Sequence, residues 1–387
     1  MSKFAMANEN DIINGSSTDV YFDKTEEYLK KLNVNPNVTM EVTISSSAYN
    51  YINFTGLNDV ISLLENHNIN LYAIPEGTLI RPRDDNGIPV PFIRIEGKYL
   101  DFAEFETPLL GFICQASGIS SYSSMIKKIL NNIPFMSFGI RRMHPAISIM
   151  IDRSAYIGGA SGVSGVLSAK VLGIEASGTM PHALSLILGD DEAWKIQHDN
   201  SNFRVFLIDT YMDEKFAAIK AADEFPDIDY IRLDTPSSRR GNFPNIIREI
   251  RWELGIRNHK NIKIMVSGGI KIEDLNELVN AGVEAFGIGT SIASAKPVDF
   301  AMDIVNIEDV NKTKRGKFSG IKNVLRCDKC YKVKTVLNNI NEEKCDCGGT
   351  MKNIMEKYIE NGKIIKKENI NIIRKRSLNE INNILNL

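Results

Sequence analysis

The sequence lacks a long uninterrupted hydrophobic run. Its longest uncharged stretch, Thr107 to Ile126, is broken by a proline, two glycines, a glutamine and serines, which is unlike a transmembrane helix. The opening residues, MSKFAMANENDIING, hold no continuous apolar segment of the kind found in signal peptides. We therefore expect a cytoplasmic protein with no membrane partner.

Cysteine is also scarce, and its placement is uneven. Of the five cysteines in 387 residues, Cys114 stands alone, and the other four form the pattern C-x2-C-x14-C-x-C at Cys327, Cys330, Cys345 and Cys347. Such spacing is unlike a disulfide framework and suits four thiolates around a tetrahedral structural Zn²⁺. The second pair is shorter than the usual C-x2-C, and a redox pair or a cluster is the alternative.

The net charge of −2 conceals a basic tail. From Lys312 to Leu387 there are 18 lysines and arginines against 8 acidic residues. A basic segment beside a metal site would suit contact with nucleic acid. We favour the simpler interpretation of a small metal-bound appendage on an acidic body, with no nucleic-acid partner.

The length of 387 residues suggests two or three domains. The first hundred or so residues mix polar helical stretches with extended apolar ones, which indicates an α+β domain. After them, short apolar runs alternate with helical patterns, and the runs are 135–142, 172–179, 204–210, 229–235, 262–269 and 284–291. Near-continuous apolar runs are typical of parallel strands buried on both faces.

Polar residues come at the carboxyl ends of these runs. They are Arg141, Thr179, Asp209, Asp234, Ser267–Gly269 and Gly287–Thr290. An open doubly wound sheet and a closed barrel both give this rhythm, but in a barrel the ends form one ring around a single mouth. The pattern therefore favours an irregular parallel α/β barrel.

Glycines directly after two consecutive late runs, in MVSGG (265–269) and GIGT (287–290), indicate a phosphate cradle made by backbone N–H groups. Tight turns alone are the alternative interpretation. Asp209 and Asp234 are candidates for Mg²⁺ ligation, for hydrogen bonds to sugar hydroxyls or for stabilising a cationic transition state, and helix capping is the alternative for one of them.

Basic side chains surround the same predicted mouth. Guanidinium groups bind phosphate and carboxylate oxygens, and the candidates are Arg141, Arg142, Arg232, Arg239 and Arg240. His182 is a candidate general base or phosphate acceptor. Spacing does not separate His182 from His144 or from a histidine that only begins a helix.

Several segments resemble, in order, the motifs of the nicotinate phosphoribosyltransferases. They include STDVYF (17–22), FGIRRMHP (138–145), SGTMPHAL (177–184), IDTYMDE (208–214), IRLDTPSSRRGN (231–242), SGGI (267–270) and FGIGTS (286–291). The four-cysteine tail resembles the zinc-knuckle-like C-terminal domain of the archaeal branch of that family.

The resemblance implies a type II phosphoribosyltransferase architecture. An N-terminal α/β domain, residues 1–124 joined by strands from 297–322, would pack on an irregular parallel α/β barrel, residues 125–296. Residues 323–387 would form the zinc-binding domain. The active site would lie at the subunit interface of a homo-oligomer, at least a dimer.

The implied reaction transfers ribose 5-phosphate from phosphoribosyl pyrophosphate to nicotinate, with Mg²⁺ accompanying the pyrophosphate. By resemblance, Arg232 lies beside the nicotinate carboxylate, Arg141 binds phosphate or pyrophosphate, and Asp234 binds the ribose hydroxyls. The 5′-phosphate cradle would be formed by Gly268, Gly269, Gly287 and Gly289. Thr179 and Thr290 are further binding candidates at the strand ends.

Three more residues take roles from the resemblance. Phe138 and Tyr21 would sandwich the pyridine ring, with Tyr21 donated by the partner subunit. His182 resembles the histidine that is phosphorylated where ATP hydrolysis is coupled to the reaction; that coupling varies within the family and is left open.

Ser161 favours nicotinate over nicotinamide. Relatives that use nicotinamide carry an aspartate in the segment matching GGASG (158–162), and an aspartate would repel a carboxylate substrate. Quinolinate or nicotinamide phosphoribosyltransferase and, from another class, a zinc-ribbon nucleic-acid-binding protein are the alternatives. An aldolase-like barrel would need a lysine at a strand end, and none of the six runs ends in one.

Overall fold

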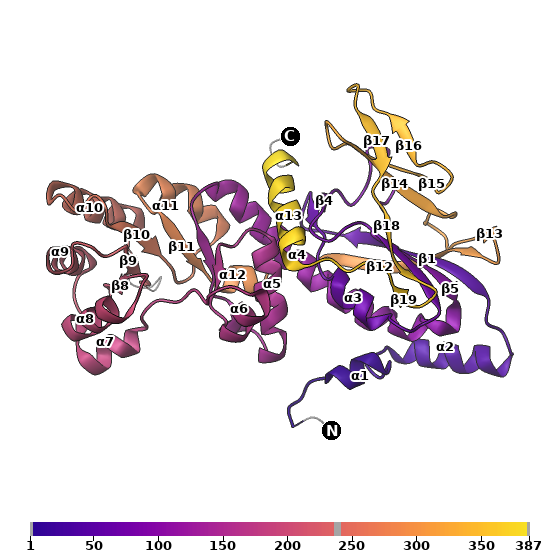
Figure 1. Cartoon of the computed structure of the whole chain (residues 1–387), viewed down its shortest axis with the longest axis horizontal. Coiled ribbons are helices and arrows are strands. Elements are labelled where there is room, and N and C mark those ends of the chain that lie inside the picture. Colours follow the sequence, from indigo (N-terminus) through magenta and orange to yellow (C-terminus); the bar gives the residue numbers. More distant parts are fainter. Residues whose placement is uncertain (1–2, 236–240, 385–387) are drawn as a thin grey trace. The chain divides into compact units, whose positions relative to one another are not determined.

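The computed structural model describes residues 3–235 and 241–384. The chain divides into two compact units (Figure 1). The first combines Met1–Ser124 with Ala295–Leu387, and the second is Met125–Ser294. Within the described residues, no helix is long and apolar enough to cross a membrane.

A seven-stranded sheet forms the centre of the first unit. Its strand order is β13-β12-β1-β5-β3-β18-β19, and its neighbours are antiparallel. The strands are β1 (Asn37–Ser46), β3 (Ile69–Ala73), β5 (Ile93–Lys98), β12 (Asp299–Ile307), β13 (Val310–Asn311), β18 (Glu356–Glu360) and β19 (Lys363–Ile364). A two-stranded sheet, β2 (Ile52–Asn53) with β4 (Leu79–Ile80), accompanies it.

Both faces of β1 are covered, although only one is apolar. Val38, Met40 and Val42 belong to the main hydrophobic core. On the opposite face the buried carboxylate of Glu41 accepts a hydrogen bond from Nζ of Lys322 at 2.8 Å. The strand is buried almost throughout, and on its polar face the ion pair with Lys322 compensates the buried charge of Glu41.

The helices of the first unit include one that is rich in serine. They are α1 (Glu9–Ile13), α2 (Val20–Lys31), α3 (Leu57–Leu63), the short turns η1 (Tyr99–Asp101) and η2 (Ala103–Phe105), and α13 (Ile370–Ile384); α4 (Glu106–Leu130) begins here and ends in the second unit. In α4, Ser121 Oγ accepts from Asn53 N at 2.9 Å, and Ser117 Oγ accepts from Thr55 N at 3.1 Å. The uncharged serine-rich stretch is thus part of a helix whose buried hydroxyls at Ser117 and Ser121 are hydrogen-bonded.

The four cysteines lie in a separate antiparallel sheet of the first unit. Its order is β15-β14-β17-β16, with β14 (Lys322–Cys327), β15 (Val333–Leu337), β16 (Glu342–Lys344) and β17 (Thr350–Asn353). We expected all of residues 323–387 to belong to this domain. Instead β18 pairs with β3 of the seven-stranded sheet, where Glu356 lies opposite Ala73. The expected domain therefore includes too many residues, because the strand that pairs with β18 lies far away in the chain.

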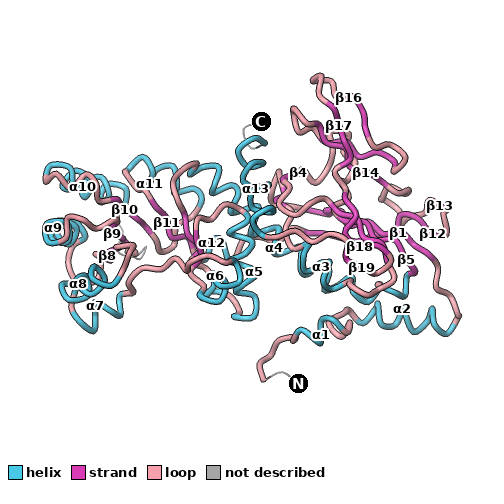
Figure 2. The backbone as a smooth tube through the Cα atoms, in the orientation of Figure 1, coloured by secondary structure: helices cyan, strands magenta, loops and turns pink. Residues whose placement is uncertain are grey.

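The second unit is built on a parallel sheet with order β7-β6-β11-β10-β9-β8. Figure 2 labels β8, β9, β10 and β11 of this sheet. Its strands are β6 (Phe135–Ser137), β7 (Gly162–Val163), β8 (Val205–Leu207), β9 (Tyr230–Leu233), β10 (Lys263–Val266) and β11 (Ala285–Ile288). Every pairing is parallel, and β7 and β8 are the two edges, so the sheet is a half-barrel. The predicted α/β fold class, with a barrel-type parallel sheet and an N-terminal α/β domain, is confirmed, and the described strands form a half-barrel rather than a closed ring.

Helices connect these strands. They are α5 (Ser148–Ile157), α6 (Val166–Leu172), α7 (His182–Leu188), α8 (Asp190–Asn200), α9 (Glu214–Glu224), α10 (Phe243–Ile256), α11 (Leu275–Ala281) and α12 (Thr290–Ala293), with the short turns η3 (Ile140–Arg142), η4 (Pro145–Ile147) and η5 (Ile272–Asp274).

One predicted strand is wrong. Residues 172–179 form the end of α6 and a loop, and β7 takes the expected place in the sheet. Gly173, with φ +69°, ends α6, and Ile174 N donates back to Ala169 O at 3.0 Å. An apolar residue just after a left-handed glycine is a common helix ending, and its pattern looks like a short strand.

Candidate active site

Arg232 on β9 is the hub of a side-chain cluster at the carboxyl edge of the parallel sheet. Its Nε donates to Ser267 Oγ at 2.8 Å, and its Nη2 lies 3.1 Å from Asp234 Oδ2. A third contact reaches Thr179, in the loop before α7. The guanidinium therefore joins three of the predicted strand-end positions.

Asp234 follows β9 and lies at the middle of this cluster. Its Oδ1 accepts from Ser267 Oγ at 2.8 Å, while its side chain stays 26% exposed. A Cβ at Gly268 would lie 2.8 Å from that Oδ1, and Gly268 has φ +78°. Glycine at 268 thus leaves room for the carboxylate, which remains accessible to a ligand.

Asp209, at the end of the β8 segment, is buried beneath Asp234. Its Oδ2 accepts from Asp234 N at 2.8 Å and from Thr235 Oγ1 at 3.2 Å. Burial raises the pKa of Asp209, and the nearby His182 ring opposes that rise. Within the described residues its buried Oδ1 has no hydrogen-bond partner, so this oxygen is a free acceptor.

His182, the first residue of α7, faces both carboxylates. Its Nε2 lies 3.8 Å from Asp209 Oδ1 and 3.9 Å from Asp234 Oδ2, and its Nδ1 is 3.2 Å from Thr210 Oγ1. The ring is 39% exposed. By contrast His144 is exposed, and its Nδ1 accepts from Ala146 N in η4. The geometry separates two histidines that spacing could not.

Phe138 brings an aromatic face to Arg232. The centre of its ring lies 5.7 Å from the guanidinium carbon. Its backbone N donates to Ile288 O at 2.9 Å, which fixes it beside β11. An aromatic ring and a cation are thus adjacent at this edge, which suits a flat anionic ligand.

The two glycine loops lie next to one another because β10 and β11 are paired. Ser291 Oγ donates to Ile270 O at 2.8 Å and links them. Gly269 and Thr290 are exposed, and a Cβ at Gly269 would meet nothing within 4 Å. Gly289 precedes α12 directly. Open backbone of this kind allows close approach of a phosphate.

Comparison with known proteins identifies the family. Residues 19–117 match the quinolinate phosphoribosyl transferase N-terminal domain, and residues 119–303 match the C-terminal domain of the same family. The crystal structure of a nicotinate-nucleotide pyrophosphorylase from Pyrococcus furiosus is 44% identical, covers 100% of both chains and has a TM-score of 0.95. The chain belongs to the quinolinate and nicotinate phosphoribosyltransferase family.

Other members of the family are more distant. Nicotinate phosphoribosyltransferase of Bacillus subtilis is 29% identical over 58% of this chain and 46% of its own length. That of Mycobacterium tuberculosis, pncB2, is 26% identical over 66% of this chain and 56% of its own length. The chain thus spans about half the length of these curated relatives. The human nicotinic acid phosphoribosyltransferase structure shares the fold, with a TM-score of 0.72 at 15% identity over 95% of this chain and 94% of its own.

Some predicted site residues lie outside the Arg232 cluster. Arg141 and Arg142 are exposed on η3, after β6. Ser161 is exposed before β7, and its N–H donates to Phe135 O at the start of β6, which places it toward the amino ends of the strands. Arg239 and Arg240 fall outside the described residues.

Tyr21 belongs to the first unit. It lies on α2, is 56% exposed, and its hydroxyl donates to Asp19 Oδ2 at 3.4 Å. An exposed aromatic side chain at the start of a helix is available to a ligand or to another chain.

Three residues that contact the site were given no role by the sequence analysis. Ser267 bridges Arg232 and Asp234. The Thr235 hydroxyl lies between two carboxylates, 3.2 Å from Asp209 Oδ2 and 3.1 Å from Glu214 Oε1, which share its single hydrogen. A hydroxyl residue after each strand-end aspartate, Thr210 and Thr235, was the visible signal. Only the fold shows which groups these hydroxyls contact.

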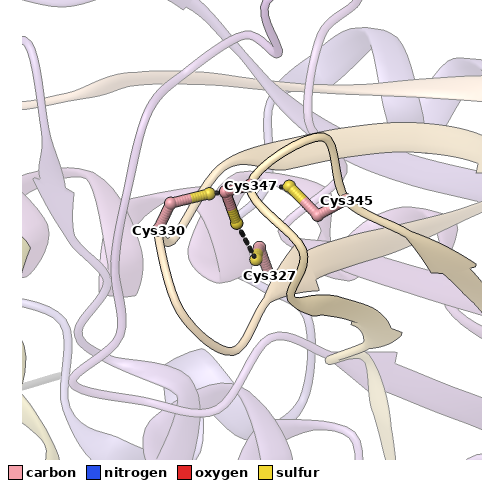
Figure 3. A group of neighbouring side chains, drawn as sticks. All are labelled: Cys327, Cys330, Cys345 and Cys347. Carbon is pink, nitrogen blue, oxygen red and sulfur yellow. Dashed lines mark hydrogen bonds between the residues drawn. The ribbon is translucent and has the colours of Figure 1, made fainter.

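The four cysteines form a second candidate site, in the first unit. Their sulfurs all lie within 4.8 Å of one another, with 3.4 Å between Cys327 and Cys347 and 3.6 Å between Cys330 and Cys345 (Figure 3). Zn–S bonds of about 2.3 Å put the sulfurs of a tetrahedral site about 3.8 Å apart. The thiols therefore fit a four-coordinate metal ion.

Proposed function

We propose that this protein transfers ribose 5-phosphate from phosphoribosyl pyrophosphate to nicotinate, giving nicotinate mononucleotide and pyrophosphate. One observation carries the proposal: Phe138, Arg232 and Asp234 form a continuous contact cluster at the carboxyl edge of the parallel sheet. The cluster offers an aromatic surface, a cation and a carboxylate to one ligand. Those groups match a pyridine ring, its carboxylate and a ribose.

The acceptor is a pyridine monocarboxylate. Its ring would lie on Phe138, with Tyr21 of a second subunit on the other face, and its carboxylate would meet Arg232. Bidentate pairing with a guanidinium fits a carboxylate better than a neutral amide. We therefore propose nicotinate rather than nicotinamide; Ser161 lies toward the amino ends of the strands and carries no charge that would repel the carboxylate from a distance.

The ribose carbon gains positive charge as pyrophosphate departs. Asp234 and Asp209 supply negative charge beneath that centre, and preorganised charge of this kind lowers the barrier. Burial raises the pKa of Asp209 and so disfavours its ionised form. The hydrogen bonds to its Oδ2 oppose this rise and stabilise the carboxylate. The Asp234 carboxylate takes the ribose hydroxyls.

Mg²⁺ is implied by the pyrophosphate leaving group. The unpartnered Oδ1 of Asp209 and the accessible carboxylate of Asp234 are the hard oxygen donors that Mg²⁺ prefers. When bound there, the ion neutralises charge on the leaving group. Arg141 is the further cation that we assign to phosphate or pyrophosphate, and Gly269, Gly289 and Thr290 to the 5′-phosphate.

A homodimer would complete the site. Large apolar side chains are exposed on α6 and on α7, the helix that begins at His182, and they are Val166, Leu167, Leu186 and Ile187. Exposed apolar groups of this extent mark association surfaces. We propose that a second copy of the chain covers them and contributes its Tyr21.

The four-cysteine cluster would hold a structural zinc ion. Four sulfur ligands leave no open coordination position, so the metal stabilises the fold and takes no part in the reaction. Metal content measured on the purified protein tests this: one zinc per chain is expected, and a metal-free folded protein contradicts it.

Pyrophosphate release tests the proposed reaction. The protein is given phosphoribosyl pyrophosphate and Mg²⁺ with nicotinate, nicotinamide or quinolinate, each with and without ATP. We expect release with nicotinate, and a rate increase with ATP only if His182 is phosphorylated. No release with nicotinate under any condition overturns the proposal.

Quinolinate is the second candidate acceptor, because both matched family domains are those of quinolinate phosphoribosyl transferase. Quinolinate carries two carboxylates and loses one as CO2 when it forms nicotinate mononucleotide. Release of CO2 together with pyrophosphate would support this candidate, and pyrophosphate release without CO2 supports nicotinate.

A further inference from the structure

Gly287 lies inside β11 and is fully buried, unlike the exposed Gly269. A Cβ placed on Gly287 would lie 2.5 Å from both Cδ2 and Cε2 of Phe138, and 3.0 Å from Cβ of Ser267. Carbon atoms do not approach that closely in folded proteins. Gly287 therefore leaves the space that the Phe138 ring occupies.

The Phe138 ring has no simple way to withdraw from Gly287. Its backbone N is hydrogen-bonded to Ile288 O, and the next residue, Gly139, is packed so tightly that a Cβ there would lie 2.6 Å from Gly289 O. Because the backbone is held, a larger residue at 287 must turn or push the ring itself. The ring would then move relative to Arg232, which now lies 5.7 Å from its centre.

We propose that Gly287 is a specificity-determining residue that seats Phe138 and so sets the width of the slot for the aromatic acceptor. This rests on the proposed function, which places the acceptor ring on Phe138 and its carboxylate at Arg232. It assigns Gly287 a task different from that of the exposed glycines, which face the 5′-phosphate. The pair of glycine loops thus serves two substrates.

The first experiment separates the two substrates kinetically. Gly287→Ala is expected to raise the KM for nicotinate about tenfold or more, because packing is lost when a methyl group is forced into a filled site, and to leave the KM for phosphoribosyl pyrophosphate within about twofold. Gly255→Ala is the matched control: it lies in α10, and its Cβ would meet nothing within 4 Å. It should change neither KM.

The second experiment needs no activity. Phe138→Leu shortens the side chain and makes room for a methyl group at position 287. The fall in melting temperature of the Gly287→Ala/Phe138→Leu double variant should therefore be smaller than the sum of the falls in the two single variants. Additive shifts in melting temperature would overturn the proposal that Gly287 positions the Phe138 ring. So would equal increases in both KM values, or an increase for phosphoribosyl pyrophosphate alone.

The two experiments also distinguish failure of the proposal that Gly287 positions Phe138 from failure of the proposed function. If the unaltered protein gives no pyrophosphate release with nicotinate, the proposed function fails. The melting temperatures of the single and double variants still decide whether Gly287 positions Phe138. Non-additive effects of the two substitutions support this role, and additive effects contradict it.

Discussion

The Arg232 cluster in the second unit and the four-cysteine cluster in the first are built in opposite ways. The first draws on residues from Phe138 to Ser267 and leaves Asp234 26% and His182 39% exposed. The second uses four thiols close together in the chain, all within 4.8 Å of one another. One cluster leaves donors and acceptors for a ligand, whereas the other brings its ligand atoms together around a single point.

This difference assigns separate tasks. An open cluster assembled from many strand ends can bind and transform a substrate, because its groups are not all used within the protein. A closed set of metal ligands contributes to folding free energy. Changes in the first should therefore alter turnover with little effect on stability, and changes in the second should do the reverse.

The largest effect is expected at the cysteines. Cys327→Ser removes a buried ligand, and loss of structural zinc forfeits on the order of 10 kcal/mol of metal-binding free energy. The sheet of β14 to β17 should lose its amide-exchange protection and the protein its zinc. Cys114→Ser, on α4 and outside the cluster, should retain both. Unchanged amide-exchange protection in Cys327→Ser would contradict the structural role that distinguishes the cysteine cluster from the Arg232 cluster.

Turnover should collapse in Asp234→Asn. Removing a preorganised charge beside the reacting centre typically lowers kcat by about 10²–10³-fold, while the melting temperature should barely change because the amide keeps most hydrogen bonds. Steady-state kinetics and thermal melting check this. Asp223→Asn is the control, since its exposed carboxylate pairs with His259 on the outside of the unit. Near-normal kcat in Asp234→Asn would remove this residue from the mechanism.

Thr235→Val should shift the pH profile. Burial raises the pKa of Asp209, and the Thr235 hydroxyl is among the groups that lower it. Asp209 must be ionised, so activity is lost as pH falls through its pKa, and without the hydroxyl that loss should begin at higher pH. The bond is worth about 1 kcal/mol. Thr235→Ser should restore the profile, and an unshifted acidic limb of kcat/KM in Thr235→Val contradicts the role.

The smallest effect is expected at Ser161. Ser161 lies toward the amino ends of the strands, away from the Arg232 cluster, so a negative charge there acts on the acceptor only from a distance and costs less than about 1 kcal/mol. Ser161→Asp should therefore lower kcat/KM for nicotinate by less than about fivefold, with nicotinamide less affected. Ser161→Asn supplies the uncharged comparison. Equal kinetics in all three proteins would show that a charge at this position does not reach the acceptor.

Local patterns predicted much of both clusters, and non-local contacts account for the misses. The cysteine spacing and the polar residues that end buried strands are visible in a short window of sequence. The bridge of Ser267 between Arg232 and Asp234, and the space that Gly287 leaves for Phe138, depend on which strands are neighbours.

Two predictions were wrong for different physical reasons. The run 172–179 has the composition of a buried strand, yet the left-handed Gly173 makes it a helix ending, which is a local effect. The strand β18 follows the cysteines in sequence but pairs with β3, which lies far away in the chain. Only the second error required knowledge of a tertiary partner.

Isotope-resolved competition tests the central claim most directly. Ring-deuterated nicotinate, unlabelled quinolinate and nicotinamide are supplied together at equal concentration with phosphoribosyl pyrophosphate and Mg²⁺, and the mass of the nucleotide formed identifies its source. We expect deuterated nicotinate mononucleotide to dominate, and to fall sharply in Arg232→Met. Unlabelled nicotinate mononucleotide or nicotinamide mononucleotide as the main product would contradict the assignment of a pyridine monocarboxylate to this site.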